Sequence, residues 1–387
     1  MLPLELFQAI AGDLQNDPSI VNLRLVSKSI NSVATPLAFR VVVVSDSLQS
    51  AAAVTFLQSC DESITSHVRE VIFQGDLNGE TGEDQRAALR NTFSGLAKFS
   101  MLESLRLNLH DTYEEELVNN EEVPECPSHF LLLQREIFAG LAENPPSSLL
   151  SLTLNNVIAV PNEIYSEEDF HRIFRSLQKL EISVLSIDAD EGAHLYDSAI
   201  LFWDESVPPI VRSATALTSL KIYSDQPVGS MPAMSFEDMF LPHLTSLTLH
   251  RFVFGPGDPD NFILCHKATL VRLELRESSI DCGIVDFGQH ANYPCPWHAI
   301  LARFEAELTG LHEFVFETAS GPDDDMPWRD PRFKYTREDP GFGFLDWDKP
   351  IPGEDQDLPA LESLLATVNS RRNEDSSCSS NDVRSLY

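Results

Sequence analysis

The segment Leu102-Glu103-Ser104-Leu105-Arg106-Leu107 contains the pattern that decides the fold, with apolar residues at its first, fourth and sixth positions. Two apolar residues separated by one residue, as in Leu105 and Leu107, have the period of a β-strand and lie on one face of it. The same pattern recurs at Val68/Val71/Phe73, Leu149/Leu152/Leu154, Leu177/Leu180/Ile182, Leu217/Leu220/Ile222, Leu244/Leu247/Leu249, Leu270/Leu273/Leu275 and Leu311/Phe314/Phe316. A strand that returns this often predicts a solenoid, in which each repeat buries its apolar face against its neighbours.

These strand repeats resemble leucine-rich repeats, although their spacing is irregular. Leucine-rich repeats have roughly 20–29 residues. The shortest interval between first positions, from Leu244 to Leu270, lies within this range, whereas the longest, from Leu102 to Leu149, exceeds it. The Asn or Cys that the family places after the strand is mostly replaced, by Asp76, His110, Val157, Leu185, Asp225, Phe252, Ser278 and Ala319. We therefore expect an irregular solenoid over residues 46–320. The alternative is a different α/β fold in which single matches are accidental.

Between the strands, apolar residues recur at helical spacing, which predicts helices at residues 47–58, 85–99, 129–142, 167–177 and 298–308. Strands that alternate with helices predict an α/β fold with a parallel sheet.

The first 45 residues carry a different pattern, which predicts three short helices. Leu6, Phe7, Ile10 and Leu14 recur at helical spacing, Asp17-Pro18 is typical of a helix start, and a third helix is expected around Ser29 to Leu37. The segment resembles an F-box, a helical module that docks on the small adaptor subunit of the SCF ubiquitin ligase and, through it, on a cullin. The resemblance implies adaptor-binding roles for Leu2, Pro3, Leu6, Ile10, Leu23, Val26 and Ser27. The alternative is a helical cap on the larger domain.

Residues 321–369 form a C-terminal insertion and capping segment that is rich in Pro and Asp. Its aromatic residues are Trp328, Phe333, Tyr335, Phe342, Phe344 and Trp347. They fit either a recognition surface or a cover over the open end of the solenoid, and terminal repeats need such a cover. Residues 370–387 are polar and predict a disordered tail.

The composition argues for an intracellular protein with protein partners. A formal net charge of -33 disfavours nucleic acid and anionic membrane surfaces. Six scattered cysteines do not suggest a disulfide framework, and no apolar run is long enough to span a bilayer. The F-box pattern begins at the second residue, which leaves no room for a cleaved signal peptide. We expect a cytoplasmic or nuclear location.

The sequence lacks the common catalytic motifs, so we expect no catalytic residue and no cofactor. The pair Cys295 and His298 offers two metal ligands, but a zinc site needs four. His110-Asp111 and Asp323-Asp324-Asp325 lack the pattern of an acid–base pair or a calcium loop.

Binding chemistry is better represented, because the residues between the apolar strand positions would face the concave side of a solenoid. The cationic and aromatic members of that set are unusual on so acidic a chain, and they are Arg106, Lys221, Tyr223, His250 and Arg276. The sequence therefore predicts a substrate-recognition subunit of an SCF-type ubiquitin ligase, with these residues contacting a protein substrate. The alternative is a leucine-rich-repeat interaction scaffold that acts outside ubiquitination.

Overall fold

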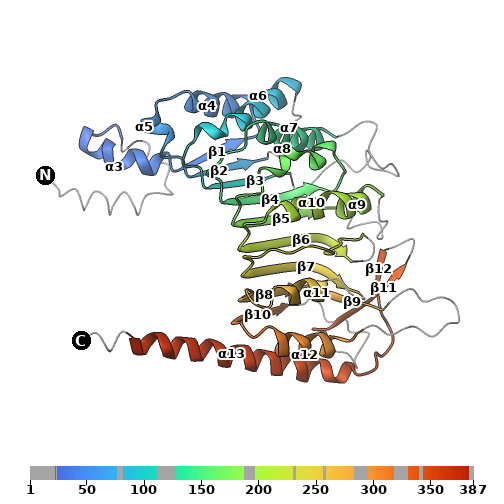
Figure 1. The fold of residues 1–387 in the computed structure, drawn as a ribbon. Helices are drawn as coiled ribbons and strands as arrows, with labels where there is room; N and C mark the ends of the chain where they lie inside the picture. Colours follow the sequence, from blue (N-terminus) through green and yellow to red (C-terminus); the bar gives the residue numbers. More distant parts are fainter. Residues whose placement is uncertain are drawn as a thin grey trace. The chain divides into compact units, whose positions relative to one another are not determined.

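The computed structural model describes residues 22, 24–75, 82–110, 128–186, 197–229, 232–255, 259–282, 295–317, 330–339 and 343–382. Strands alternate with helices along the chain (Figure 1). The chain divides into two compact units. The first comprises residues 1–117, 126–157 and 162–178, and the second comprises residues 118–125, 158–161 and 179–387.

Short helices and parallel strands make up the first unit. In chain order they are α3 (Lys28–Ala38), β1 (Val41–Ser45), α4 (Leu48–Gln58), α5 (Glu62–Thr65), β2 (Glu70–Gln74), α6 (Glu83–Ser94), η1 (Leu96–Lys98), β3 (Ser104–Asn108), α7 (His129–Glu143), β4 (Ser151–Ile158), η3 (Glu163–Ser166) and α8 (Glu168–His171). Serine hydroxyls define three helix starts by accepting a hydrogen bond from a first-turn amide. They belong to Ser27 before α3, Ser47 before α4 and Ser128 before α7.

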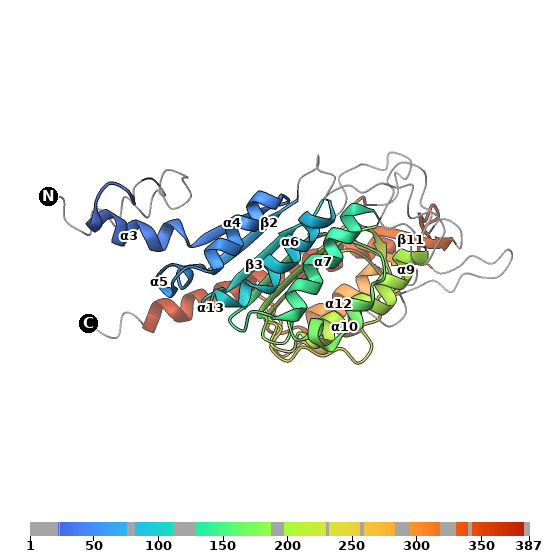
Figure 2. The same ribbon diagram turned by 90° about the horizontal axis from the view of Figure 1, so that it is seen from above.

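The strands of the first unit pair in parallel and in the register that the repeats predict. Val71 of β2 lies opposite Leu105 of β3, which lies opposite Leu152 of β4. These side chains are buried, and helices α4, α6 and α7 cover their side of the sheet (Figure 2). The ring of Phe73 packs edge-on against Phe93 of α6, with ring centroids 5.8 Å apart. The apolar strand positions therefore build the core against the helices.

The second unit continues the alternation and adds a C-terminal group of strands. Its elements are β5 (Lys179–Leu185), α9 (Asp197–Leu201), the π-helix η4 (Phe202–Ser206), α10 (Val207–Ser213), β6 (Ser219–Val228), β7 (Ser246–Phe254), α11 (Pro259–Cys265), β8 (Arg272–Arg276), β9 (Ser279–Asp281), α12 (Trp297–Glu307), β10 (Glu313–Glu317), β11 (Lys334–Asp339), β12 (Gly343–Asp346), η5 (Glu354–Gln356) and α13 (Asp357–Asp382). Strands β5, β6, β7, β8 and β10 pair in parallel, and their apolar positions are in register from Leu180 to Phe314.

Two strand paths of the second unit turn at residues in the left-handed backbone region. Arg251 (φ 61°) lies within β7, and Glu277 (φ 49°) lies between β8 and β9. Beyond these positions, the end of β7 pairs with β9, and β9 pairs in parallel with β11. Strand β12 then runs antiparallel to β11. The two residues therefore mark the place where the chain leaves the strands that pair from β5 to β10 and enters a second set, formed by the end of β7 with β9, β11 and β12.

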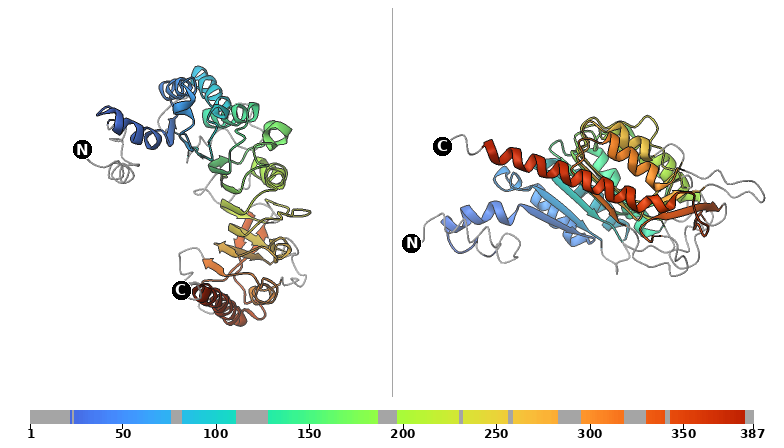
Figure 3. Two further views of the ribbon diagram at one scale, coloured as in Figure 1. Left: turned by 60° about the vertical axis from the view of Figure 1, so that its left-hand side comes forward. Right: turned by 90° about the horizontal axis from the view of Figure 1, so that it is seen from below.

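Helices α12 and α13 pack side by side at the C-terminal end of the second unit (Figure 3). The buried carboxylate of Asp357, at the start of α13, accepts hydrogen bonds from the hydroxyl of Tyr335 (2.5 Å) and from the backbone amide of His298 in α12 (2.8 Å). Phe333, Tyr335 and Trp347 are buried, so these three aromatic residues of the insertion belong to the core. Trp328 and Phe342 lie outside the described residues.

Two predicted boundaries differ from the structure. Residues 370–382 belong to α13, although their polarity predicted a disordered tail, and the guanidinium of Arg371 anchors this helix to the backbone oxygens of Glu305 and Leu308. Strand β1 lies within the range predicted for the F-box, yet it pairs with β2, because Val44 supplies a buried residue opposite Phe73. The sheet therefore begins before residue 46.

Candidate protein-binding face

The side of the second unit's sheet that faces away from its core carries three rows of side chains, which we call the strand face. The first row is Lys179, Ser219, Ser246, Arg272 and Glu313; the second is Glu181, Lys221, Thr248, Glu274 and Val315; the third is Ser183, Tyr223, His250, Arg276 and Glu317. Each row crosses five strands, which lie about 4.8 Å apart in a sheet. The parallel register thus brings Lys221, Tyr223, His250 and Arg276 together, as the sequence predicted.

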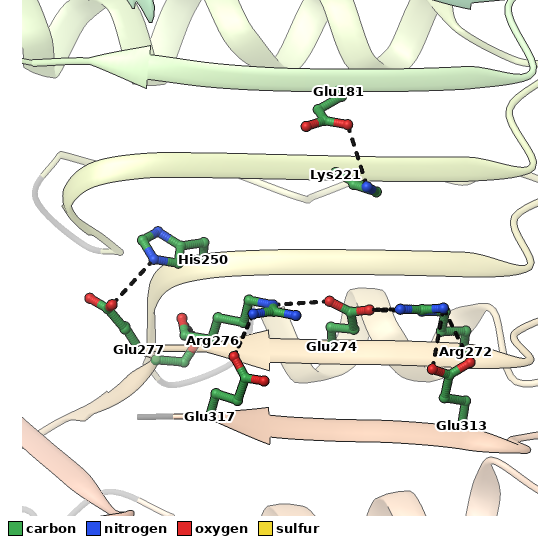
Figure 4. Close-up of polar contacts among 10 residues, drawn as sticks. Glu181, Lys221, His250, Arg272, Glu274, Arg276, Glu277, Glu313 and Glu317 are labelled. Atoms are coloured by element: carbon green, nitrogen blue, oxygen red, sulfur yellow. Dashed lines mark hydrogen bonds and ion pairs between the residues drawn. The ribbon is translucent and has the colours of Figure 1, made fainter. Parts of the chain in front are cut away.

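Glu274 is the centre of a charged network on the strand face (Figure 4). Its side chain is only 6% exposed and accepts hydrogen bonds from Nε of Arg272 (2.8 Å) and from Nε of Arg276 (3.0 Å). Burial opposes the charged form, but these two hydrogen bonds outweigh it and lower the pKa of Glu274 below its ordinary value. Arg272 also forms an ion pair with Glu313, and Arg276 forms one with Glu317. Both guanidinium groups are therefore held in fixed positions.

Lys221 forms a more exposed ion pair beside this network. Its ammonium lies 3.4 Å from the carboxylate of Glu181 on the neighbouring strand, and the lysine side chain is 41% exposed. An ion pair in such a setting contributes little to stability, so its partners can exchange at low cost. Thr248, which follows in the same row of the strand face, is buried, as Glu274 is.

Tyr223 and His250 supply an aromatic pair in the third row, with ring centroids 5.6 Å apart. Nδ1 of His250 donates to the backbone oxygen of Ser224 (3.0 Å), and Nε2 lies 3.6 Å from Glu277. Burial raises the pKa of the Tyr223 hydroxyl. This hydroxyl makes no hydrogen bond with any residue that the structure describes, so it can bond to an incoming group.

A second charged cluster lies where the strands turn. Nε of Arg251 donates to Glu277 at 2.7 Å, and both residues have a left-handed backbone conformation. Asp225 accepts the amide of Ser186 at 2.9 Å with each carboxylate oxygen. Burial nevertheless raises the pKa of Asp225 to about 6. The sequence patterns did not single out Arg272, Arg251, Glu277 or Asp225 as functional residues.

Arg106, the remaining residue predicted to bind substrate, lies on the sheet of the first unit. Its register neighbours are Ile72 on β2 and Thr153 on β4. Arg106 is exposed and forms no ion pair with the residues that the structure describes. Beside it, the amides of Gln74, Asn108 and Asn155 form a ladder, in which Asn155 donates to Asn108 (2.8 Å) and Asn108 donates to Gln74 (3.1 Å).

The predicted adaptor-binding residues fall mostly outside the described part of the chain. Leu2, Pro3, Leu6, Ile10 and Leu23 belong to the residues that are not described. Val26 is 65% exposed and its neighbour Leu25 is 85% exposed, while Ser27 caps helix α3. Two adjacent apolar side chains therefore face solvent at the start of α3.

The described residues contain neither a metal-binding cluster nor a membrane-spanning helix. No group of three or more His, Cys, Asp or Glu residues there is arranged to hold a metal ion. Cys295 is exposed, and His298 contacts Asp357 instead. Within the same part of the chain, no helix is both long and apolar enough to cross a membrane.

Comparison with known proteins gives a structural similarity but no family. No protein-family model matches the sequence, and no curated protein matches it. Among solved structures, the fold is similar to an internalin from Listeria monocytogenes, with 14% sequence identity and a TM-score of 0.21 over 79% of this chain and 95% of that chain. A similarity at this level says nothing about function.

Proposed function

We propose that this chain is a protein-binding adaptor, and that it serves as the substrate-recognition subunit of an SCF-type ubiquitin ligase. The observation that supports a binding role is the parallel register of β5, β6, β7, β8 and β10, which gathers Lys221, Tyr223, His250 and Arg276 on the strand face. Tyrosine and arginine are enriched among the residues that dominate the energy of protein interfaces.

The charged network prepares the strand face for binding. Because Glu274 and Glu317 already hold the guanidinium of Arg276, little side-chain entropy is lost when a partner contacts it. The free hydroxyl of Tyr223 offers a hydrogen-bond donor and acceptor beside it. Lys221 can exchange Glu181 for a carboxylate of the partner, since their ion pair is exposed. The strand face therefore suits a polar protein surface that contains both carboxylates and aromatic or hydroxyl groups.

The N-terminal segment supplies the second half of the proposal. The exposed Leu25 and Val26 lie directly before α3 and fit a surface that a partner covers. The resemblance of residues 1–45 to an F-box supports the small SCF adaptor subunit as that partner. In this arrangement the chain works by proximity, because it raises the effective concentration of a substrate lysine near the conjugating enzyme. No residue of the chain takes part in the chemistry.

Affinity purification with three variants tests both halves. We expect deletion of residues 1–27 to remove the adaptor and cullin while it retains the substrate. This deletion ends before β1, so it spares the sheet. Replacement of Lys221, Tyr223 and Arg276 by alanine is expected to remove the substrate and retain the adaptor. Lys267→Ala, an exposed lysine outside the strand face, serves as the control and should change neither.

The outcomes separate the proposal from its alternative. If the intact chain recovers neither adaptor nor cullin, but loses a partner in the triple-alanine variant, the chain is an interaction scaffold that acts outside ubiquitination. If the triple-alanine variant retains every partner, the strand face is not the binding surface.

A further inference from the structure

A second candidate binding site lies in the first unit, at the starts of its strands. A cleft of about 400 Å³ is lined by Pro36, Leu37, Arg40, His67, Arg69 and Glu103. This volume lies at the lower end of the range for ligand-binding pockets. The cleft is formed by the end of α3 together with the residues that precede β1, β2 and β3.

Backbone hydrogen bonds fix the positions from which the charged side chains emerge. The amides of Arg69 and Glu70 both donate to the backbone oxygen of Arg40, at 2.9 and 3.0 Å. In the same way, the amides of Glu103 and Ser104 donate to the backbone oxygen of Arg69, at 2.9 and 3.0 Å. Arg40, Arg69 and Glu103 therefore stand at three successive strand starts of one parallel sheet.

The two arginines of the cleft have unused hydrogen-bond donors. Within the described part of the chain, Arg69 bonds through Nη1 alone, which donates to Glu103 and to the backbone oxygen of Met101, both at 3.3 Å. Arg40 is exposed, and its guanidinium forms no hydrogen bond or ion pair with the part of the chain that the structure describes. Guanidinium donors bind carboxylate and phosphate oxygens in a fixed, bidentate geometry.

The charge of the cleft differs from that of the chain. Two guanidinium groups and the imidazole of His67 face a single carboxylate, that of Glu103, whereas the whole chain has a formal net charge of -33. Pro36 and Leu37 add an apolar wall beside these donors. The combination of free guanidinium donors with a short apolar wall fits an acidic group that is followed or preceded by an aliphatic side chain.

We propose that this cleft binds an acidic segment of a partner protein, with a carboxylate or phosphate oxygen at Arg40 and Arg69 and an aliphatic side chain against Pro36 and Leu37. This site is separate from the strand face, and it does not depend on the function proposed above. Glu103 competes with the ligand for Arg69, so it limits the affinity of the site.

Selection from a random heptapeptide display library on the intact chain tests this proposal. We expect the selected peptides to share Asp or Glu next to Leu, Ile or Val. Synthetic, fluorescently labelled copies should bind about tenfold more weakly to an Arg40→Gln/Arg69→Gln variant, which corresponds to ~1.4 kcal/mol. Arg135→Gln, an exposed arginine on α7, is the matched control and should bind like the parent chain.

A variant that binds more tightly would show that the weaker binding of the double variant does not come from misfolding. Glu103→Gln removes the competing carboxylate, so we expect it to bind the same peptides more tightly. Replacement of the acidic peptide residue by glutamine should abolish binding, and replacement by phosphoserine shows whether the site also accepts a phosphate. Selected peptides without an acidic residue, or peptides whose affinity is unchanged by the Arg40→Gln/Arg69→Gln variant, would overturn the proposal.

Discussion

Glu274→Gln is the substitution that should perturb the strand face most, because it removes the carboxylate that joins two arginines. The change keeps the size of the side chain but replaces a charged acceptor with an amide. One amide oxygen can still accept a hydrogen bond, whereas the amide nitrogen is brought against a guanidinium donor. The variant therefore loses at least one of the two hydrogen bonds to Arg272 and Arg276, together with its favourable charge.

The loss of unfolding free energy depends on how far Glu274 and its two arginine partners are buried. A hydrogen bond to a charged group is worth about 1.5–3 kcal/mol. Arg272 and Arg276 are 44% and 34% exposed, so they can partly recover their hydration when Glu274 is lost. We therefore expect Glu274→Gln to lower the free energy of unfolding by about 2–3 kcal/mol, and not by the larger amount typical of an uncompensated buried charge.

Urea unfolding followed by tryptophan fluorescence measures this cost, and Glu313→Gln provides the matched control. Glu313 bonds the same Arg272 at 3.2 Å, but both side chains are 44% exposed. Such a pair contributes less than about 1 kcal/mol, and high salt weakens it further. If the two glutamine variants unfold at the same urea concentration, Glu274 is not the centre of the network and the argument fails.

Three further substitutions test the core and the charged cluster where the strands turn. Gly140→Ala should destabilise by about 1–3 kcal/mol in urea unfolding, because the added carbon would lie 2.4 Å from the backbone oxygen of Arg90, whereas Gly82→Ala, which meets nothing within 4 Å, should cost less than about 1 kcal/mol. Leu220→Ala should cost about 2–5 kcal/mol, and a cost near zero would contradict its core position. Asp225 binds its proton more readily in the folded state, with a pKa of about 6 against an ordinary 3.8, so its contribution to stability is present below about pH 4 and is lost as the pH rises through 6. Relative to the parent chain, Asp225→Asn should therefore gain up to about 3 kcal/mol between pH 4 and pH 7 in parallel unfolding curves, and a constant difference would contradict the assignment.

The strand repeats could be predicted because their signal is local. An apolar residue at every second position, preceded by a third apolar residue, identifies both the strand and its buried side. The pairing of Leu105 with Leu152, and of Leu220 with Leu247, follows from aligning these patterns. The same alignment placed Lys221, Tyr223 and Arg276 on one face.

The depth of each polar side chain could not be predicted, since it depends on long neighbours from adjacent strands. Glu274 is buried, and its carboxylate accepts hydrogen bonds from the arginines two residues before and two residues after it, Arg272 and Arg276. The alternation of Arg, Glu and Arg at every second residue was a usable signal of an ion-pair ladder. The left-handed turn at Arg251 had no such signal, because this conformation is uncommon outside glycine.

The C-terminal region shows a second limit. Polar composition predicted a tail after residue 369, but α13 extends to Asp382, and Arg371 joins it to the end of α12. A single arginine that bonds two backbone oxygens leaves no periodic trace in the sequence. The buried Asp357, which joins α12 to Tyr335, is equally invisible to pattern analysis.

Titration calorimetry of the intact chain with the purified SCF adaptor subunit tests the central claim most directly. The proposed function predicts saturable one-to-one binding. A Leu6→Asp/Leu23→Asp variant should lose this binding, because a carboxylate cannot be buried in an apolar contact without a large cost. The triple-alanine variant of Lys221, Tyr223 and Arg276 should bind the adaptor like the parent chain. Absence of binding by the parent chain, or undiminished binding by the Leu6→Asp/Leu23→Asp variant, would contradict the claim that this protein is an F-box adaptor.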